Sequence, residues 1–363
     1  MASSVPQQFR AAQFTKKGGN LEIRQVQMKQ PGENEIIIKV RAASLNSTDQ
    51  ILRNDLLPGL NFPLTPSSSI VGKIVKMGRQ GGMASGKLRE GMDVAAVTFK
   101  GGLGEYAKVH ECNVVEIKRG EFQGQEEEAA VFAFDAGRVW GTYRRCEREY
   151  KHMDEHERRL MKEVNERLGF GNSHGCIVVY GEGGYARLAL DILRKGQQHS
   201  GGFLGSGGQQ QLRVILVATT DRWSARDYDI EDKHMLLANK GDLRHELKQL
   251  GGACMVVCVD QPRHGFENLL DSTRYGATLA ILNPTRDARL EVPLANIIAK
   301  SIRVQGPPIL SSHCLEETLQ LCQKQRIRAA VKKYRFDQNE VNQAWRDLEQ
   351  GEKFEAPLVV FQQ

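Results

Sequence analysis

The chain has 363 residues, 40% of them hydrophobic and 26% charged, which is typical of a soluble globular protein and long enough to favour two domains. Its net charge of +6 is spread along the chain, so we expect no nucleic-acid partner, because such a partner calls for a concentrated basic stripe. The seven cysteines form no CxxC pair, and the sequence shows no secretory signal and no apolar run of about 20 residues, so we expect a cytoplasmic protein with free thiols and no membrane contact.

The first third of the chain is a series of short runs rich in β-branched residues, separated by glycine, proline and asparagine. This pattern predicts an all-β, barrel-like unit with little helix. The expected strands cover residues 21–26, 35–40, 70–75, 93–99 and 105–109.

The pattern changes near residue 127. An acidic start followed by an apolar run predicts a helix over 127–134. Residues 144–168 then carry dense charge of both signs, which predicts an insertion of one or two mostly solvated helices, although it could also cover a substrate or make another contact. His152 and His156 in this insertion are spaced for chelation on a helix, but we interpret them as surface residues.

From residue 176 onwards, strands alternate with helices, which predicts a doubly wound parallel sheet. Residues 185–193 place apolar side chains on one helix face, and residues 196–211 form a polar stretch that predicts a loop. The expected strands cover 176–180, 213–218, 255–259 and 278–282, and a further helix is expected near 266–272.

The last fifty residues predict two helices and a closing strand. The first helix covers 315–324, and the second follows an acidic capping sequence at 337–340 and ends at Gly351. The strand covers 357–361.

A glycine-rich turn directly follows the first strand of the parallel sheet. Gly181 allows the tight turn, Gly183 lets the backbone approach a pyrophosphate, and Ala186 lets helix and strand pack closely. Free N–H groups of the following helix, which begins near Gly184 and Tyr185, suit phosphate charge. We therefore predict that a dinucleotide binds at this turn. The bulk of the residue at 182 and of Tyr185 leaves open a turn without a ligand.

The end of the second parallel strand indicates which dinucleotide binds. An enzyme that uses NAD places an acid there to hold the ribose hydroxyls, but this chain has Ala218. Thr219, Thr220 and Arg222 follow and suit a 2′-phosphate, so the sequence favours NADPH over NADH. Asp221 is the argument for NADH, because a shift of one residue would bring it to the ribose.

The chain resembles the medium-chain dehydrogenase/reductase superfamily, in particular its zinc-free quinone oxidoreductases and enoyl reductases. The resemblance implies an α/β protein in which a GroES-like β-barrel catalytic domain, residues 1–137 completed by 310–363, accompanies a Rossmann domain with a doubly wound parallel sheet, residues 138–309. It also implies an active site in the cleft between the two domains. The segments that carry it are Ala43–Asp49, Gly72–Val75, Gly91–Val94, Phe336–Ala344 and Leu348–Gly351.

In zinc-containing members of this group, a cysteine, a histidine with an adjacent glutamate, and a later cysteine surround the metal. The matching positions here are Asn46, Ser68 with Ser69, and approximately Asp135. Zinc prefers thiolate and imidazole ligands, so we predict an enzyme without zinc.

Hydride addition to a carbonyl or an activated alkene leaves negative charge on oxygen, which requires hydrogen-bond donors and finally a proton. By resemblance, Thr48 matches the hydroxyl relay of the superfamily, and the amide of Asn46 is a second candidate catalytic group. An ordinary helix cap explains the same Asn-Ser-Thr-Asp sequence. Asn283 matches a position beside the nicotinamide carboxamide.

The leading hypothesis is a zinc-independent, NADPH-dependent reductase of an enone, an enoyl thioester or a quinone, with a possible place in secondary metabolism. The alternatives are a zinc-free ketone reductase or alcohol dehydrogenase, and a non-redox cyclase-like or binding protein on the same fold. Related dimers pair the strand that matches 302–309. Because Pro307 and Pro308 cannot donate to a ladder, we predict a monomer or an atypical homodimer.

Overall fold

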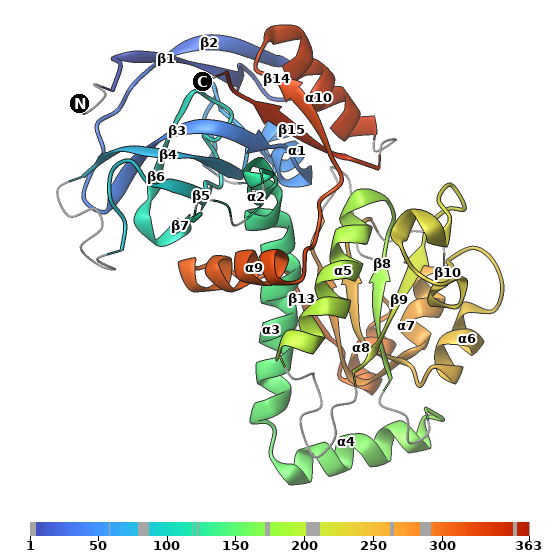
Figure 1. Cartoon of the computed structure of the whole chain (residues 1–363). Coiled ribbons are helices and arrows are strands. Elements are labelled where there is room, and N and C mark those ends of the chain that lie inside the picture. The colour runs from blue at the N-terminus through green and yellow to red at the C-terminus, as the bar shows by residue number, and fades with distance from the viewer. Residues whose placement is uncertain are drawn as a thin grey trace. The chain divides into compact units, whose positions relative to one another are not determined.

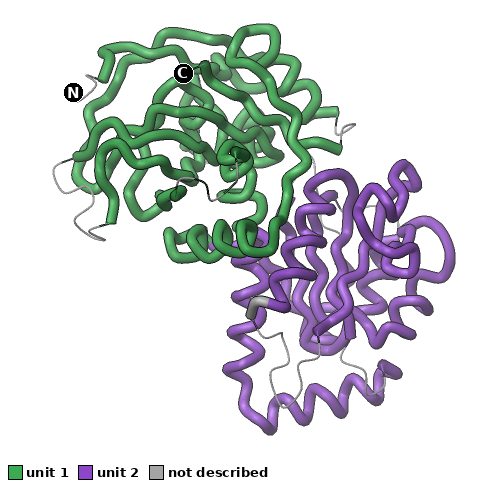
Figure 2. Tube along the Cα trace, in the orientation of Figure 1, with its two compact units in different colours: residues 1–137, 309–363 green, residues 138–308 purple. Residues whose placement is uncertain are grey.

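The computed structural model describes residues 5–362 except for 58, 79–86, 119, 121, 123, 171–174, 201–210, 262–264, 284–291 and 351–353. The chain divides into two compact units (Figure 2). Unit 1 consists of residues 1–137 and 309–363, and unit 2 consists of residues 138–308. The predicted closing residue of the last long helix, Gly351, lies outside the described residues.

Unit 1 is built around a mixed sheet of seven strands, and a separate hairpin accompanies it (Figure 1). The sheet has the order β14-β15-β3-β4-β5-β7, and β6 pairs with β3 outside this path. The hairpin consists of β1 (Gln8–Phe14) and β2 (Leu21–Gln27). The sheet strands are β3 (Glu35–Ser44), β4 (Ser69–Met77), β5 (Asp93–Val97), β6 (Tyr106–His110), β7 (Val114–Glu116), β14 (Val331–Arg335) and β15 (Ala356–Val360). The all-β character predicted for this part of the chain is confirmed.

The sheet of unit 1 is accompanied by helices, among them α1 (Ser47–Arg53), α9 (Ser312–Lys324) and α10 (Gln338–Gln350). Helix α10 packs on β15 and contributes the buried Trp345, whose ring meets Phe14 of β1 edge to face at 4.9 Å. The C-terminal segment thus completes the core that the N-terminal strands begin.

A continuous helical run connects the two units. It begins with a 3₁₀ turn (Glu126–Glu128) and α2 (Ala129–Val131), passes through a π-helical turn (Phe132–Ala136) and continues as α3 (Gly137–His152). The helix expected over 127–134 is therefore present but much longer. π-Helical turns of this kind occur frequently at functional sites, and this one carries Asp135.

Unit 2 contains a fully parallel sheet of six strands in the order β10-β9-β8-β11-β12-β13 (Figure 1). This is the doubly wound order, in which the chain starts in the middle and reverses direction across the sheet, and it confirms the predicted fold class. The strands are β8 (Cys176–Tyr180), β9 (Arg213–Ala218), β10 (Met235–Leu237), β11 (Ala253–Cys258), β12 (Thr273–Ile281) and β13 (Arg303–Gln305).

The helices α5 (Gly183–Ser200), α6 (Leu243–Gln249), α7 (Phe266–Asp271) and α8 (Leu294–Lys300) flank this sheet. The loop expected over 196–211 is wrong at its start, because α5 continues to Ser200. Gly196 lies so close to the indole ring of Trp140 that a Cβ atom at this position would stand 2.4 Å from it. This glycine therefore serves close helix packing and does not mark a loop.

The charged insertion consists of the second half of α3 and of α4 (Glu155–Arg167). The prediction of one or two mostly solvated helices holds, since most of the side chains are exposed, but α4 has one buried attachment to the sheet. The Asn165 side chain accepts a hydrogen bond from the Tyr275 amide at 2.8 Å and donates one to the Met161 carbonyl at 2.8 Å. Asn165 thereby attaches α4 to β12.

The strand expected over 302–309 forms only at Arg303–Gln305. Pro307 and Pro308 follow at once and have no N–H to donate, so the ladder stops before them. Among the described residues, no helix is both long and apolar enough to cross a bilayer. The expected monomer or atypical homodimer stays a prediction.

Candidate functional sites in the two units

The glycine turn of unit 2 lies at the carboxyl edge of the parallel sheet, where doubly wound proteins bind their ligands. It connects β8 with α5, and the Gly181 amide donates to the Val217 carbonyl of the neighbouring β9 at 3.1 Å. Because all strands are parallel, Thr219, Asp260 and Asn283 follow their strands at this same edge. The structure thus places the predicted residues of the turn, of β9 and of β12 on one rim.

The two glycines of the turn have different roles. At Gly181, with φ +139°, a Cβ atom would stand 2.8 Å from Val259 Cγ2, so this position is closed by packing. At Gly183, with φ +77°, a Cβ atom would meet nothing within 4 Å. Gly183 is therefore an open cradle at the start of an 18-residue helix, and Ala186 is fully buried behind it. These features fit the phosphates of a dinucleotide.

Tyr228 supports this turn from the segment after β9. The Gly183 amide donates to the Tyr228 hydroxyl at 3.0 Å, and the Tyr228 side chain is buried. Burial, and then the nearby carboxylates led by that of Glu182, raise the pKa of Tyr228 well above its usual value, so the phenol stays protonated. The amides of Gly184 and Tyr185 lie beside the Gly183 amide in the first turn of α5.

At the end of β9, the residues expected to hold a 2′-phosphate have other contacts. The Thr220 hydroxyl donates to Glu182 Oε2 at 2.5 Å and accepts from the Arg222 amide at 3.3 Å. The exposed Arg222 guanidinium lies over the Trp223 ring at 5.2 Å. Asp221 forms a 2.5 Å ion pair with Lys240, and this contact lowers the pKa of its carboxyl group.

In unit 1, Asn46 occupies the position directly before α1. Its Oδ1 accepts from the Thr48 amide at 2.9 Å, and its own amide donates to Asp49 Oδ2 at 2.9 Å, which completes a reciprocal cap. The helix-cap interpretation of this sequence is therefore present in the structure. Asn46 Nδ2 is nevertheless buried without a hydrogen-bond partner, so this group stays a candidate donor to a ligand. Thr48 is buried beside it on the first turn.

Asp49 lies at the centre of this group of residues, and it was not predicted as a site residue from the sequence. Its second oxygen accepts from the Ser67 amide at 2.7 Å, and the side chain is 0% exposed. Burial, with a smaller contribution from the negative charge of Asp135, raises the pKa of Asp49 to about 7 despite these two hydrogen bonds. The carboxyl group therefore titrates near neutral pH.

The three positions that match the zinc ligands of related enzymes are thus all connected to Asp49. Asn46 and Asp135 both act on Asp49, and Ser68 directly follows its partner Ser67. The Ser68 hydroxyl is buried and has no hydrogen-bond partner. Amide, hydroxyl and carboxylate groups without thiolate or imidazole do not suit zinc, and no cluster of three or more metal-binding side chains occurs within the described residues.

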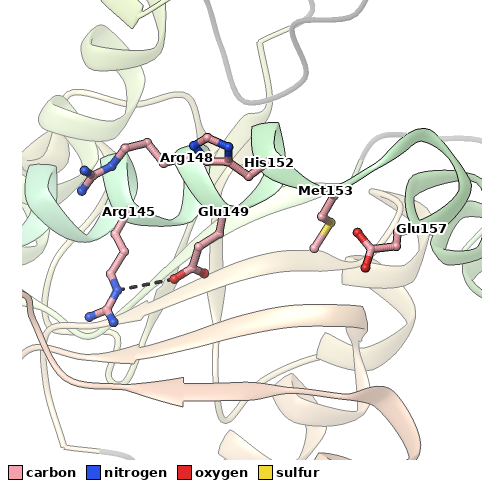
Figure 3. A pocket seen from close by; sticks show the side chains of 6 residues that line it. All are labelled: Arg145, Arg148, Glu149, His152, Met153 and Glu157. Atoms are coloured by element: carbon pink, nitrogen blue, oxygen red, sulfur yellow. Dashed lines mark ion pairs between the residues drawn. The ribbon is translucent and has the colours of Figure 1, made fainter.

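A separate hollow of about 490 Å³ lies along the end of α3 and the start of α4 (Figure 3). It is lined by Arg145, Arg148, Glu149, His152, Met153 and Glu157. Glu149 pairs with Arg145 at 3.4 Å and with Arg303 of β13 at 2.6 Å, so the charges serve contacts within unit 2. His152 and His156 are both exposed, as predicted from their charged surroundings.

Comparison with known proteins agrees with this architecture. The alcohol dehydrogenase GroES-like domain matches residues 32–145. An alcohol dehydrogenase, notN, of Aspergillus sp. (strain MF297-2) is 22% identical over 98% of this chain and 99% of its own length. The domain match covers less than half of the chain, and together with the full-length similarity to notN it supports the resemblance to the medium-chain dehydrogenase/reductase superfamily.

Two further comparisons concern the cofactor and the metal. The structure of an alcohol dehydrogenase, rspB, of E. coli CFT073 in complex with NADH has a TM-score of 0.69 and 14% identity, and the match covers 98% of this chain and 100% of that one. A zinc-type alcohol dehydrogenase-like protein, YogA, of Leptosphaeria maculans is 37% identical over 89 residues, which are 23% of this chain and 25% of that protein. The first similarity is one of fold, and the second is limited to about a quarter of each chain.

Proposed function

We propose that this protein transfers hydride from a reduced nicotinamide dinucleotide to a carbonyl-conjugated alkene or a quinone, without zinc. The observation that carries the proposal is the donor set of unit 1, where Asn46, Ser68 and Asp135 stand at the positions that match the zinc ligands of related enzymes. The open cradle at Gly183 supports cofactor binding in unit 2.

The cofactor would supply the hydride, and the side chains of unit 1 would stabilise the charge that develops on the substrate oxygen. Asn46 Nδ2 and the Ser68 hydroxyl are buried and have no protein partner, so a substrate oxygen would satisfy them. Thr48 remains the proposed relay hydroxyl. Asp49, whose pKa is about 7, accepts a hydrogen bond from the backbone amide of Asn46 and would orient this cap as the charge changes.

A zinc-free ketone reductase or alcohol dehydrogenase is the second candidate, favoured by the full-length similarity to a protein named an alcohol dehydrogenase. The two candidates differ in substrate. We expect chelator-treated protein to oxidise reduced nicotinamide with enones or quinones faster than with saturated ketones. The opposite order would favour the second candidate, and absence of oxidation with all of them would favour a cyclase-like or binding protein.

The sequence favours NADPH through Thr219, Thr220 and Arg222. Of these, Thr220 is bonded to Glu182 and Arg222 lies over Trp223. Asn283 remains the proposed neighbour of the nicotinamide. The choice between the two cofactors depends on the charge at this rim.

A further inference from the structure

Glu182 occupies an unusual place for a carboxylate. It is the second residue of the glycine turn, where the chain leaves β8 and enters α5. The hydrogen bond of Thr220 to Glu182 Oε2, at 2.5 Å, draws the carboxylate to the carboxyl end of β9. The turn is fixed there as well, because the Gly181 amide donates to Val217 of the same strand.

This placement supplies a group that β9 itself lacks. In doubly wound dinucleotide-binding domains, an acid at the end of the second strand accepts hydrogen bonds from the adenosine ribose. Strand β9 ends in Ala218, and no acid follows until Asp221, whose carboxylate is held by Lys240. Glu182 thus brings a carboxylate to the end of β9 from the neighbouring strand connection.

The charged groups around Glu182 also favour a ribose 2′-hydroxyl over a 2′-phosphate. Tyr228, which accepts from the Gly183 amide, lies within the influence of the carboxylates of Glu182, Asp227 and Asp260. Three of the cations described near this rim have other contacts. Lys240 pairs with Asp221, Arg187 donates to the Asp227 carbonyl at 3.3 Å, and Arg222 lies over Trp223. A 2′-phosphate here would meet a like charge, whereas a 2′-hydroxyl would meet an acceptor.

We propose that Glu182, held by Thr220, is the ribose-binding acid of this protein and selects NADH over NADPH. This inference rests on the proposed function, since it assumes that a nicotinamide dinucleotide binds at the glycine turn. Residues 219–222, which follow β9, predict NADPH when they are considered alone. The carboxylate of Glu182, which comes from the glycine turn and reaches the end of β9, favours NADH instead.

The test is a titration of the full-length protein with NADH and with NADPH, followed by nicotinamide fluorescence. We expect wild-type protein to bind NADH at least about ten-fold more tightly, since one buried or half-buried like-charge contact corresponds to a factor of this order. Glu182→Gln removes the charge and keeps the shape, so the two dissociation constants should converge to within about three-fold. Thr220→Ala frees the carboxylate and should reduce the ratio partly.

Glu163→Gln is the matched control, because it makes the same change at an exposed carboxylate of unit 2 that lies on α4 and pairs with Arg167. It should leave the ratio unchanged. A parallel measurement uses 5′-ADP and 2′,5′-ADP as probes of the ribose corner, with thermal stabilisation as the readout. The same preference should appear without the nicotinamide.

The outcomes separate the two proposals. Tighter binding of NADPH by wild-type protein, or an unchanged ratio in both Glu182→Gln and Thr220→Ala, would overturn the role of Glu182 and leave the proposed function intact. Absence of binding of either cofactor would overturn both.

Discussion

Gly183→Ala is the substitution that most clearly separates cofactor binding from folding. Gly183 has φ +77°, a conformation that favours glycine, and a Cβ atom there would meet nothing within 4 Å. The added methyl group therefore causes no collision inside the protein. It projects into the space where the backbone is expected to approach a pyrophosphate.

The expected cost in stability is that of the backbone alone. Placing alanine in the left-handed region costs about 1–2 kcal/mol, and no cavity or clash adds to it. The expected cost in binding is larger, because the methyl group and a phosphate oxygen compete for one position. We predict at least about ten-fold weaker cofactor binding, or about 1.4 kcal/mol.

Gly169→Ala is the matched control. Gly169 lies in the same unit, has φ +82°, and would likewise place its Cβ atom in open space, but it follows α4 and not β8. Urea unfolding should show similar losses for the two variants. Titration with NADH, followed by nicotinamide fluorescence, should show weaker binding for Gly183→Ala only. Equal affinities in the two variants would refute the assignment of Gly183 as the phosphate cradle.

Three further substitutions test other parts of the structure. Asn46→Ser keeps a helix cap but removes the buried amide donor. We expect stability within about 1 kcal/mol of wild type and at least about ten-fold slower turnover. Unchanged turnover would exclude a catalytic role for the side-chain amide of Asn46. Because Asp49 has a folded-state pKa of about 7, above its unfolded value, its stabilising contribution is complete in acid and is lost as pH rises through 7. Urea unfolding at about pH 5 and about pH 8 should therefore differ by roughly 2–3 kcal/mol in favour of the lower pH, and Asp49→Asn should reduce this difference, whereas an equal pH dependence would contradict it. Asn165→Ala leaves the Tyr275 amide without its partner, so we expect the free energy of unfolding to fall by about 1–3 kcal/mol and the amides of α4 to exchange hydrogen faster. Neither effect should appear if other contacts hold α4 in place.

Much of the fold could be predicted from the sequence because its signals are local. Buried parallel strands such as Cys176–Tyr180 form continuous apolar runs, and the glycine turn directly follows one of them. The errors arise where a distant residue decides the structure. Gly196 lies in a polar stretch typical of a loop, but the indole ring of Trp140 packs against it and the helix continues. Pro307 and Pro308 lie just beyond β13, which is limited to three residues. The proline pair predicts that the strand is interrupted, but it does not predict the residue at which the strand ends.

The candidate sites were less predictable for the same reason. The glycine turn was predicted from its spacing, and Asn46 and Thr48 from the resemblance to the superfamily, but the sequence gave no sign that Tyr228 contacts Gly183. Glu182 was noted only as a bulky residue, because its bond to Thr220 joins two separate strand connections. Asp49 could have been selected as the fourth residue of the Asn46 capping sequence. Its burial and its coupling to Asp135 depend on the folded sheet.

The central claim, hydride transfer without zinc, has a direct test. Chelator-treated protein is mixed with nicotinamide cofactor deuterated at the transferable position and with an enone, and the product is analysed by mass spectrometry. The account predicts deuterium in the saturated product at the same rate before and after chelation. A product formed only after zinc is restored, or one that contains no deuterium, would contradict it.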